Sequence, residues 1–280
     1  MLRTRLLTAA VALPALLAAI FFLPNWGFEL MIGVLGLWGL YEIYAMARPL
    51  SVPSILALLS GLSPLLWLFD PFYLRIEMTG LLNGIHPTPS AVDARCALVV
   101  LFVALSFSLF TIVRVAISGP QAVPRDLAVA SAVMCVALFP AFALVRNGAN
   151  GIALLVLMLL LVICADTGAY FVGRAIGRHK LAFKVSPGKT VEGAIGGIIA
   201  SIVGGLILRR WLVPQWSIER LTIFAGLVAI LAIIGDLANS AFKRIAGVKD
   251  SGWILPGHGG LLDRTCSLVL AAVLTYYYSR

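Results

Sequence analysis

The chain has 280 residues, of which 61% are hydrophobic and only 12% are charged, and its mean hydropathy is +1.03. Soluble domains are about 45–50% apolar and about 25% charged, so this composition excludes a water-soluble fold. The formal net charge of +9 would indicate nucleic-acid binding in a soluble protein. In a membrane protein, basic loops beside anionic lipid headgroups explain the charge better, and we expect no nucleic-acid partner.

Nine apolar stretches are long enough to cross a bilayer, whose core of about 30 Å needs roughly 20 helical residues. They cover residues 6–23, 27–46, 52–69, 96–117, 126–145, 151–173, 193–213, 221–242 and 262–278. The first follows two arginines like the core of a signal peptide, but without a clear cleavage site, so we expect a retained span. The sequence predicts an all-α, polytopic membrane protein with one domain over residues 1–280. In it, residues 1–145 are mainly scaffold, and residues 151–278 carry the catalytic spans and cytoplasmic loops.

The Lys and Arg residues set the orientation of these spans. If the N-terminus lies inside and the spans alternate, 14 of the 21 basic residues fall on the cytoplasmic side. Because cytoplasmic loops carry an excess of Lys and Arg, this bias predicts a cytoplasmic N-terminus and an external C-terminus. Two loops rich in Gly, Pro and basic residues, 174–192 and 243–261, then face the cytoplasm.

Three acidic residues lie in or at the start of predicted spans, where an ionisable group is expensive and indicates function. Asp166 and Asp236 lie seven and six residues before the cytoplasmic ends of their spans, which is roughly 10 Å of helix. Asp263 is the second residue of the last span. We expect the three carboxylates to face one cytoplasmic cavity and, with no sulfur or imidazole nearby, to suit Mg²⁺. The alternative is an acid that pairs within the bundle, as Asp263 could with Arg264 or Lys243.

The second cytoplasmic loop combines glycines with basic residues. Its run Pro256-Gly257-His258-Gly259-Gly260 lets backbone N–H groups approach an anion closely, since glycine tolerates positive φ. Lys243, Arg244 and Lys249 add positive charge, and arginine can hold a phosphate with two donors. These features suit a polyphosphate, but a basic loop that touches lipid headgroups explains the composition equally well. For His258 we favour a phosphate-contacting role over proton transfer, because a phosphate nucleophile is already ionised near pH 7.

The first cytoplasmic loop repeats this pattern. Ser186 and the proline after it are typical of a turn, and Lys189 and Thr190 could meet phosphate. Glu192 opens the next span near its helix N-terminus. The spacing is not that of a P-loop, and alone the stretch could also be an ordinary helix start.

The stretch from Ser240 to Arg264 closely resembles the diagnostic motif of the phosphatidate cytidylyltransferase family. That motif reads Ser-x-apolar-Lys-Arg, four residues, Lys-Asp-x-small, then an apolar residue and Pro before x-His-Gly-Gly, and finally Asp-Arg-x-Asp. The chain keeps Ser240, Phe242, Lys243, Arg244, Lys249, Asp250, Gly252, Leu255, Pro256, His258, Gly259, Gly260, Asp263 and Arg264. The stretches that follow Asp166 and Ser186 also look like this family.

Two positions depart from the family pattern. The motif ends in Asp where this chain has Cys266, and the family usually has Glu where this chain has Asn239. A thiol is a poor Mg²⁺ ligand, whereas an amide can still offer its carbonyl oxygen. Either Asp236 and Asp263 suffice for the metal, or the chain is a divergent or weakened member.

The resemblance implies a cytidylyltransferase of phospholipid biosynthesis in a bacterial inner membrane, which converts CTP and phosphatidate to CDP-diacylglycerol and pyrophosphate. It implies Mg²⁺, with two ions expected, held by Asp236, Asp263 and Asp166. The implied catalytic residues are Asp236, Asp263, Lys243, Arg244, Lys249, Asp250 and His258. The implied substrate-binding residues are Ser240, Gly259, Gly260, Arg264, Ser186, Lys189, Thr190 and Glu192.

Four further questions stay open, among them whether the chain is a related lipid nucleotidyl- or phosphotransferase with another lipid acceptor. An ion or substrate transporter is one rival, since buried acids and basic loops also serve ion pathways. A catalytically impaired paralogue that binds lipid or nucleotide is another, because Asn239 and Cys266 replace acids. A homodimer also stays open, because symmetric dimers are common.

Overall fold

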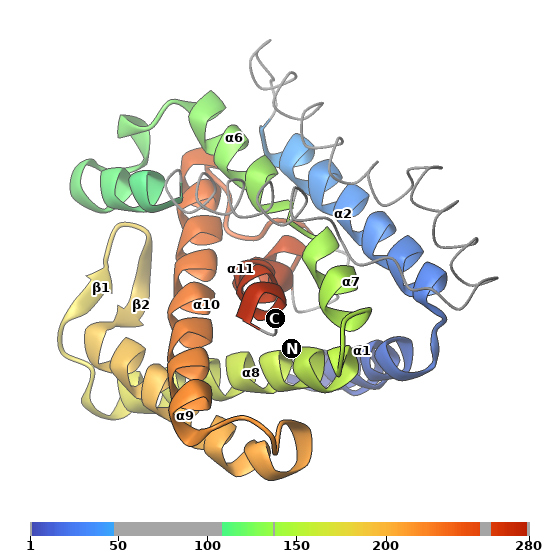
Figure 1. The fold of residues 1–280 in the computed structure, drawn as a ribbon. Helices are drawn as coiled ribbons and strands as arrows, with labels where there is room; N and C mark the ends of the chain where they lie inside the picture. The colour runs from blue at the N-terminus through green and yellow to red at the C-terminus, as the bar shows by residue number, and fades with distance from the viewer. Residues whose placement is uncertain (1, 48–107, 137, 253–258, 279–280) are drawn as a thin grey trace.

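The computed structural model describes residues 2–47, 108–136, 138–252 and 259–278. The predicted span 52–69, the first part of the predicted span 96–117 and His258 lie outside these residues. Within them, helices predominate and one small sheet interrupts them (Figure 1).

The N-terminal half begins with two long helices, α1 (Leu2–Phe22) and α2 (Asn25–Ala47). Four shorter elements lie beyond residue 107: a helix over Ser108–Ser118, the 3-10 helix η1 (Pro120–Ala122), α6 (Arg125–Val136) and α7 (Pro140–Arg146). The stretch 126–145, predicted as one span, is therefore two short helices. Pro140 explains the break, because proline lacks an N–H and is tolerated in the first turn of a helix but not in its interior.

The C-terminal half consists of four helices and a hairpin. The helices are α8 (Gly151–Ile176), α9 (Val191–Leu212), α10 (Ile218–Ala246) and α11 (Leu262–Tyr278), which match the last four predicted spans to within a few residues. Between α8 and α9, the strands β1 (Lys180–Ala182) and β2 (Ser186–Thr190) pair in antiparallel register. The all-α prediction missed this hairpin, which occupies most of the first predicted cytoplasmic loop.

Helix α10 is longer at its C-terminal end than predicted. Lys243 and Arg244 lie in its last turn and not in the loop to which the sequence assigned them. Gly247 ends the helix with φ of 75°, a left-handed conformation that glycine adopts without a Cβ penalty. The two cations therefore project from a rigid helix.

Four helices of the described residues are long and apolar enough to cross a membrane, namely α2, α8, α9 and α10. The protein is therefore a multi-pass membrane protein.

Helix α11 lies at the centre of the described fold and is seen nearly end-on in Figure 1. It packs against α6, α7, α8 and α10, while α8 and α9 pack along each other and contact α10. Helices α10 and α11 cross closely at Gly235, because this residue has no Cβ. A Cβ there would overlap the Cys266 carbonyl. This crossing fixes the neighbouring Asp236 relative to α11.

Arg146 joins α7 to the junction between α1 and α2. The residue is only 8% exposed. Its guanidinium donates to the Ile20 carbonyl and to Asn25 Oδ1, each at 2.9 Å, and also to the Leu23 carbonyl. It lies 4.8 Å from the centroid of the Phe28 ring. These partners compensate the burial of the charge and lock the helix junction.

Candidate active site

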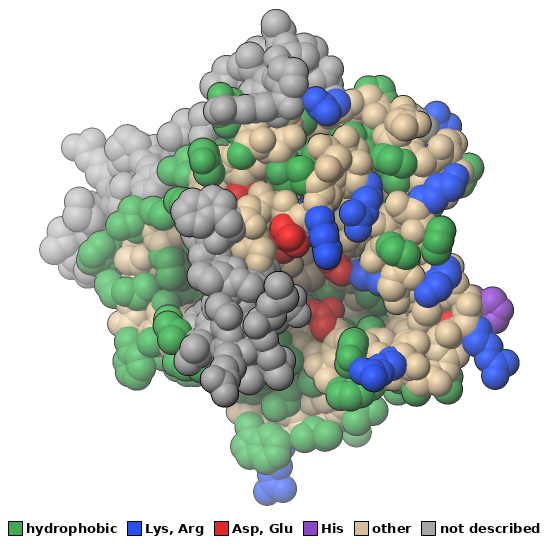
Figure 2. Space-filling model, turned by 180° about the vertical axis from the view of Figure 1, so that it is seen from behind, with side chains coloured by type: hydrophobic (Ala, Val, Ile, Leu, Met, Phe, Trp, Pro, Cys, Tyr) green, Lys and Arg blue, Asp and Glu red, His purple; other side chains and the backbone are tan. Residues whose placement is uncertain are grey.

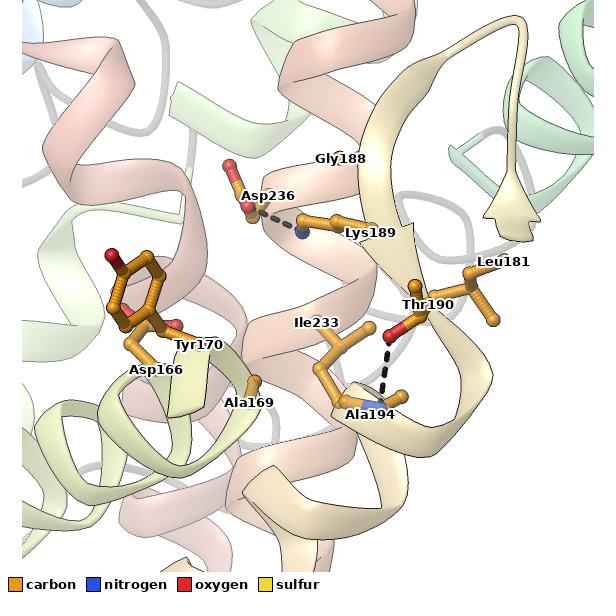
Figure 3. Close-up of a pocket in the computed structure, with 11 residues that line it drawn as sticks. Asp166, Ala169, Tyr170, Leu181, Gly188, Lys189, Thr190, Ala194, Ile233 and Asp236 are labelled. Atoms are coloured by element: carbon orange, nitrogen blue, oxygen red, sulfur yellow. Dashed lines mark hydrogen bonds and ion pairs between the residues drawn. The ribbon is translucent and has the colours of Figure 1, made fainter. Parts of the chain in front are cut away.

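A pocket of about 240 Å³ opens between α8, α9, α10 and the β1–β2 hairpin (Figure 3). Its polar lining consists mainly of Asp166, Asp236, Lys189, Thr190 and Tyr170. Pockets for drug-sized ligands measure roughly 300–1,000 Å³. The volume therefore suits the phosphates of a nucleotide and not the whole molecule.

Asp166 of α8 and Asp236 of α10 both line this pocket. Their similar predicted depths in the two spans led to the expectation that they face one cavity. Asp236 of α10 forms an ion pair with Lys189 of β2, and the two side chains are 41% and 28% exposed. Asp236, Lys189 and Arg264 all lie close enough to Asp166 to act on its charge. Two carboxylates and a lysine ammonium thus converge in the pocket.

Two predicted substrate-binding residues, Thr190 and Glu192, form hydrogen bonds at the start of α9. The Thr190 hydroxyl accepts a hydrogen bond from the Gly193 N–H at 3.1 Å, which makes Thr190 the N-cap of α9. Glu192 accepts from the N–H groups of Arg178 and His179, at 3.1 and 3.2 Å, and lies 2.5 Å from His179 Nδ1. Thr190 therefore joins the end of the strand that carries the pocket lysine to α9, and Glu192 joins the start of α9 to the segment before β1.

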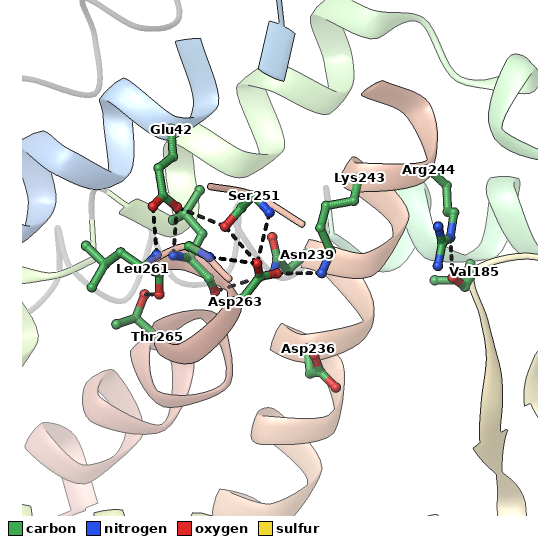
Figure 4. A network of polar contacts seen from close by, with 12 residues as sticks. Glu42, Val185, Asp236, Asn239, Lys243, Arg244, Ser251, Leu261, Asp263 and Thr265 are labelled. Carbon is green, nitrogen blue, oxygen red and sulfur yellow. Dashed lines mark hydrogen bonds and ion pairs between the residues drawn. The ribbon is translucent and has the colours of Figure 1, made fainter. Parts of the chain in front are cut away.

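Asp263 lies in a separate polar network at the first turn of α11 (Figure 4). Its Oδ1 is 2.5 Å from Lys243 Nζ and accepts from Asn239 Nδ2 at 3.1 Å. Its Oδ2 accepts from the N–H groups of Ser251 and Gly260, at 2.9 and 3.1 Å, and from the Ser251 hydroxyl at 3.0 Å. The structure thus makes Asp263 the acceptor that holds the motif loop, and Asp263 does not line the pocket.

Glu42 of α2 belongs to the same network and was missed by the sequence analysis. It is 2% exposed. Its Oε1 accepts from the Leu261 N–H at 2.7 Å and from Trp38 Nε1 at 3.3 Å. Its Oε2 accepts from the Leu262 N–H at 3.0 Å and from the Ser251 hydroxyl at 2.9 Å. An acid inside an apolar stretch was the available signal, but Glu42 lies in the half predicted to be scaffold.

The other predicted site residues surround these two groups. Arg244 donates from Nε to the Val185 carbonyl of the hairpin at 3.2 Å, and Gly259 has φ of 84°. Figure 2 shows Lys and Arg side chains gathered around a hollow that contains acidic side chains. Among the described residues, the following do not line the pocket: Ser186, Glu192, Ser240, Lys243, Arg244, Lys249, Asp250, Gly259, Gly260 and Arg264.

The donor atoms of the pocket decide whether a divalent ion fits. Asp166 and Asp236 offer the hard carboxylate oxygens that Mg²⁺ prefers. In the part of the chain that the structure describes, no three His, Cys, Asp or Glu side chains lie close enough together to hold a metal. Mg²⁺ is commonly held by one or two carboxylates together with substrate phosphates. The two acids therefore fit an ion that binds with a polyphosphate, whereas the predicted three-acid cluster is absent from these residues.

The site suits an anionic polyphosphate. A helix N-terminus, a lysine ammonium and a pair of carboxylates for a cation share one pocket, and preorganised charges of this kind stabilise phosphate transfer. Fold and site together define a polytopic membrane protein with a pocket for nucleotide phosphates.

Comparison with known proteins agrees with this class. The profile of the cytidylyltransferase family matches residues 3–280, and the chain belongs to that family. A phosphatidate cytidylyltransferase of Haemophilus influenzae is 32% identical over 99% of both chains. A phosphatidate cytidylyltransferase of Synechocystis is 42% identical over 48% of this chain and 45% of its own length. One of Brucella suis is 45% identical over 46% of this chain and 47% of its own length.

Proposed function

We propose that the protein is a membrane-bound phosphatidate cytidylyltransferase, which makes CDP-diacylglycerol and pyrophosphate from CTP and phosphatidate. The convergence of Asp166, Asp236 and Lys189 at one pocket carries the proposal. Family membership over nearly the whole chain supports the same reaction.

The proposed transfer forms one bond and breaks one. A phosphatidate oxygen bonds to the α-phosphorus of CTP while the bond from that phosphorus to the β-bridging oxygen breaks, and the electron pair leaves with pyrophosphate. Lys189 is placed to take up negative charge on the phosphates, and the positive end of the α9 dipole lies at the same pocket. The side chains need not abstract a proton, because the phosphate nucleophile is ionised near pH 7.

We propose Mg²⁺ as the cofactor, held by Asp166 and Asp236. When bound, Mg²⁺ supplies charge neutralisation at the attacked phosphate and the leaving group. Asp236 and Lys189 form an ion pair, so an anion lies beside a cation. The carboxylate of Asp236 suits a metal ion, and the ammonium of Lys189 suits a phosphate oxygen. Two ions, and Asp263 as a third ligand, stay predictions.

The finer topology is also a proposal. We propose nine spans, of which the one over 126–145 is broken at Pro140, with a cytoplasmic N-terminus in a bacterial inner membrane, and the bias of basic residues supports this orientation. CTP then enters from the cytoplasm while the lipid tails stay in the bilayer, and residues 151–278 carry the reaction. A homodimer is compatible with this arrangement.

Release of pyrophosphate by purified protein, supplied with CTP, Mg²⁺ and phosphatidate in mixed micelles, tests the proposal. We expect release to require both substrates, and replacing CTP by other nucleotides or phosphatidate by other lipids defines specificity. An intact protein that releases no pyrophosphate would refute it. A parallel flux assay in liposomes tests the alternative function, transport of an ion or substrate.

A further inference from the structure

Glu42 and Ser251 have no role in the sequence motif, yet Figure 4 shows both of them joined by polar contacts to the start of α11. Glu42 precedes Leu261, one of its partners, by 219 residues. Ser251 fills a variable position of the motif, between Asp250 and Gly252. We infer that Glu42, acting through Ser251, is a positioning residue for the loop that leads into α11. The inference rests on the function proposed above and goes beyond it by assigning a task to α2.

The Glu42 carboxylate caps α11 from a different helix. The N–H groups of Leu261 and Leu262 lie at the start of α11, where the first N–H groups have no partner within the helix. Glu42 accepts from both, at 2.7 and 3.0 Å, and a negative charge at this end is favourable. At 2% exposure of Glu42, water is excluded from the site, so losing the carboxylate would leave buried donors unpaired.

The Ser251 hydroxyl lies between two carboxylates. Its oxygen is 2.9 Å from Glu42 Oε2 and 3.0 Å from Asp263 Oδ2. A hydroxyl has one hydrogen, so it donates fully to only one acceptor at a time. Ser251 also donates its backbone N–H to Asp263 Oδ2, and Asp263 pairs with Lys243. A displacement of Glu42 would therefore move the buried Ser251 side chain, and with it the position of Asp263.

Two motif-loop glycines leave room for this carboxylate. A Cβ at Gly252 would lie 2.7 Å from Glu42 Oε1. A Cβ at Gly260 would lie 2.5 Å from Glu42 Oε2 and would overlap the Ser251 hydroxyl. A larger residue at either position would therefore have to displace the Glu42 carboxylate.

The variant Glu42→Gln tests the inference, because it keeps the shape but replaces one acceptor oxygen by a donor. Glu29→Gln is the matched control on the same helix. Glu29 is also buried, at 6% exposure, and accepts from Asn147 Nδ2 at 2.6 Å, a bond that a Gln oxygen preserves. Its charge acts on Arg146, which lies at the junction of α1 and α2 and outside the motif loop, so the control removes a buried charge away from that loop. We expect Glu42→Gln to lower kcat for pyrophosphate release about tenfold or more, with KM for CTP within about threefold, as for other supporting residues. Glu29→Gln should stay near the wild type.

A double-mutant cycle with Ser251→Ala separates positioning from general destabilisation. If Glu42 acts through Ser251, the double variant loses about as much kcat as Glu42→Gln alone. Losses that multiply, or a Glu42→Gln variant as active as Glu29→Gln, would overturn the inference. If Glu42→Gln does not fold, an unchanged kcat in Ser251→Ala overturns it and a fall in kcat alone supports it.

Amide hydrogen exchange gives a readout that is independent of turnover. We expect residues 259–263 to exchange faster in Glu42→Gln than in Glu29→Gln, since the N–H groups at the start of α11 lose their acceptor. Equal exchange would count against the inference. An inactive wild type would refute the proposed function. An active wild type together with Glu42 variants of unchanged kcat would refute only this inference.

Discussion

Lys243 and Asp263 form an ion pair whose Nζ and Oδ1 atoms are 2.5 Å apart. The pair joins the last turn of α10 to the first turn of α11. The two side chains are 14% and 9% exposed, so the pair is largely shielded from water. The pair thus closes the loop between these helices at its base.

Asp263→Asn should therefore destabilise the protein. Removing one partner of a buried ion pair leaves an uncompensated charge and costs about 3 kcal/mol. Asp236→Asn is the comparison, because its pair with Lys189 is more exposed and is worth about 1 kcal/mol or less. Thermal unfolding in detergent measures both, and equal shifts of Tm would contradict the structural role of Asp263.

Asp236→Asn should instead remove activity. An amide is a weaker Mg²⁺ ligand than a carboxylate, so we expect a loss on the order of 10²-fold in kcat and a higher Mg²⁺ concentration for half-maximal rate. Glu219→Gln, an exposed acid in the first turn of the same helix, is the control and should leave the Mg²⁺ titration unchanged. A wild-type titration curve for Asp236→Asn would exclude it as a ligand.

Lys189→Met should weaken the use of CTP. The pocket then loses the ammonium paired with Asp236, and we expect kcat/KM for CTP to fall on the order of 10²-fold. Lys184→Met is a matched control in the same hairpin, because Lys184 Nζ donates to the Ile117 carbonyl outside the pocket. Steady-state kinetics at varied CTP decide the matter, and similar losses in both variants would indicate damage to the hairpin.

Restoring the two family acids, with Asn239→Glu and Cys266→Asp together, should not raise activity. Asn239 Nδ2 donates to Asp263 Oδ1 at 3.1 Å, so a glutamate there would set like charges against each other. Pyrophosphate release by the double variant and by each single variant provides the measurement. A sharp rise in rate would mean that the natural chain is an impaired member of its family.

Much of the pocket could be predicted from the sequence. Membrane spans have a fixed rise per residue, so the positions of Asp166 and Asp236 within their spans gave their shared depth and their meeting point. The last four helices followed from hydropathy alone. The motif also pointed to Lys243 and Asp263, which the structure joins in an ion pair, and Asp263 as a metal ligand stays a prediction.

Other parts required the coordinates. Glu42 meets its partners across 219 residues, and no local pattern states which distant loop a lone acid will cap. The β1–β2 hairpin was missed because its strands are three and five residues long, which is too short for a clear alternation. The stretch broken at Pro140 was predicted as continuous because hydropathy does not register a missing N–H.

The bonds of Arg146 bear on how the chain is assembled in the membrane. Two of its acceptors, the carbonyls of Ile20 and Leu23, precede it by 126 and 123 residues. At about 5–20 residues per second, a ribosome needs roughly 6–25 s to cover that distance. The first two helices are therefore synthesised well before the side chain that locks their junction, and this contact is a late step in biogenesis.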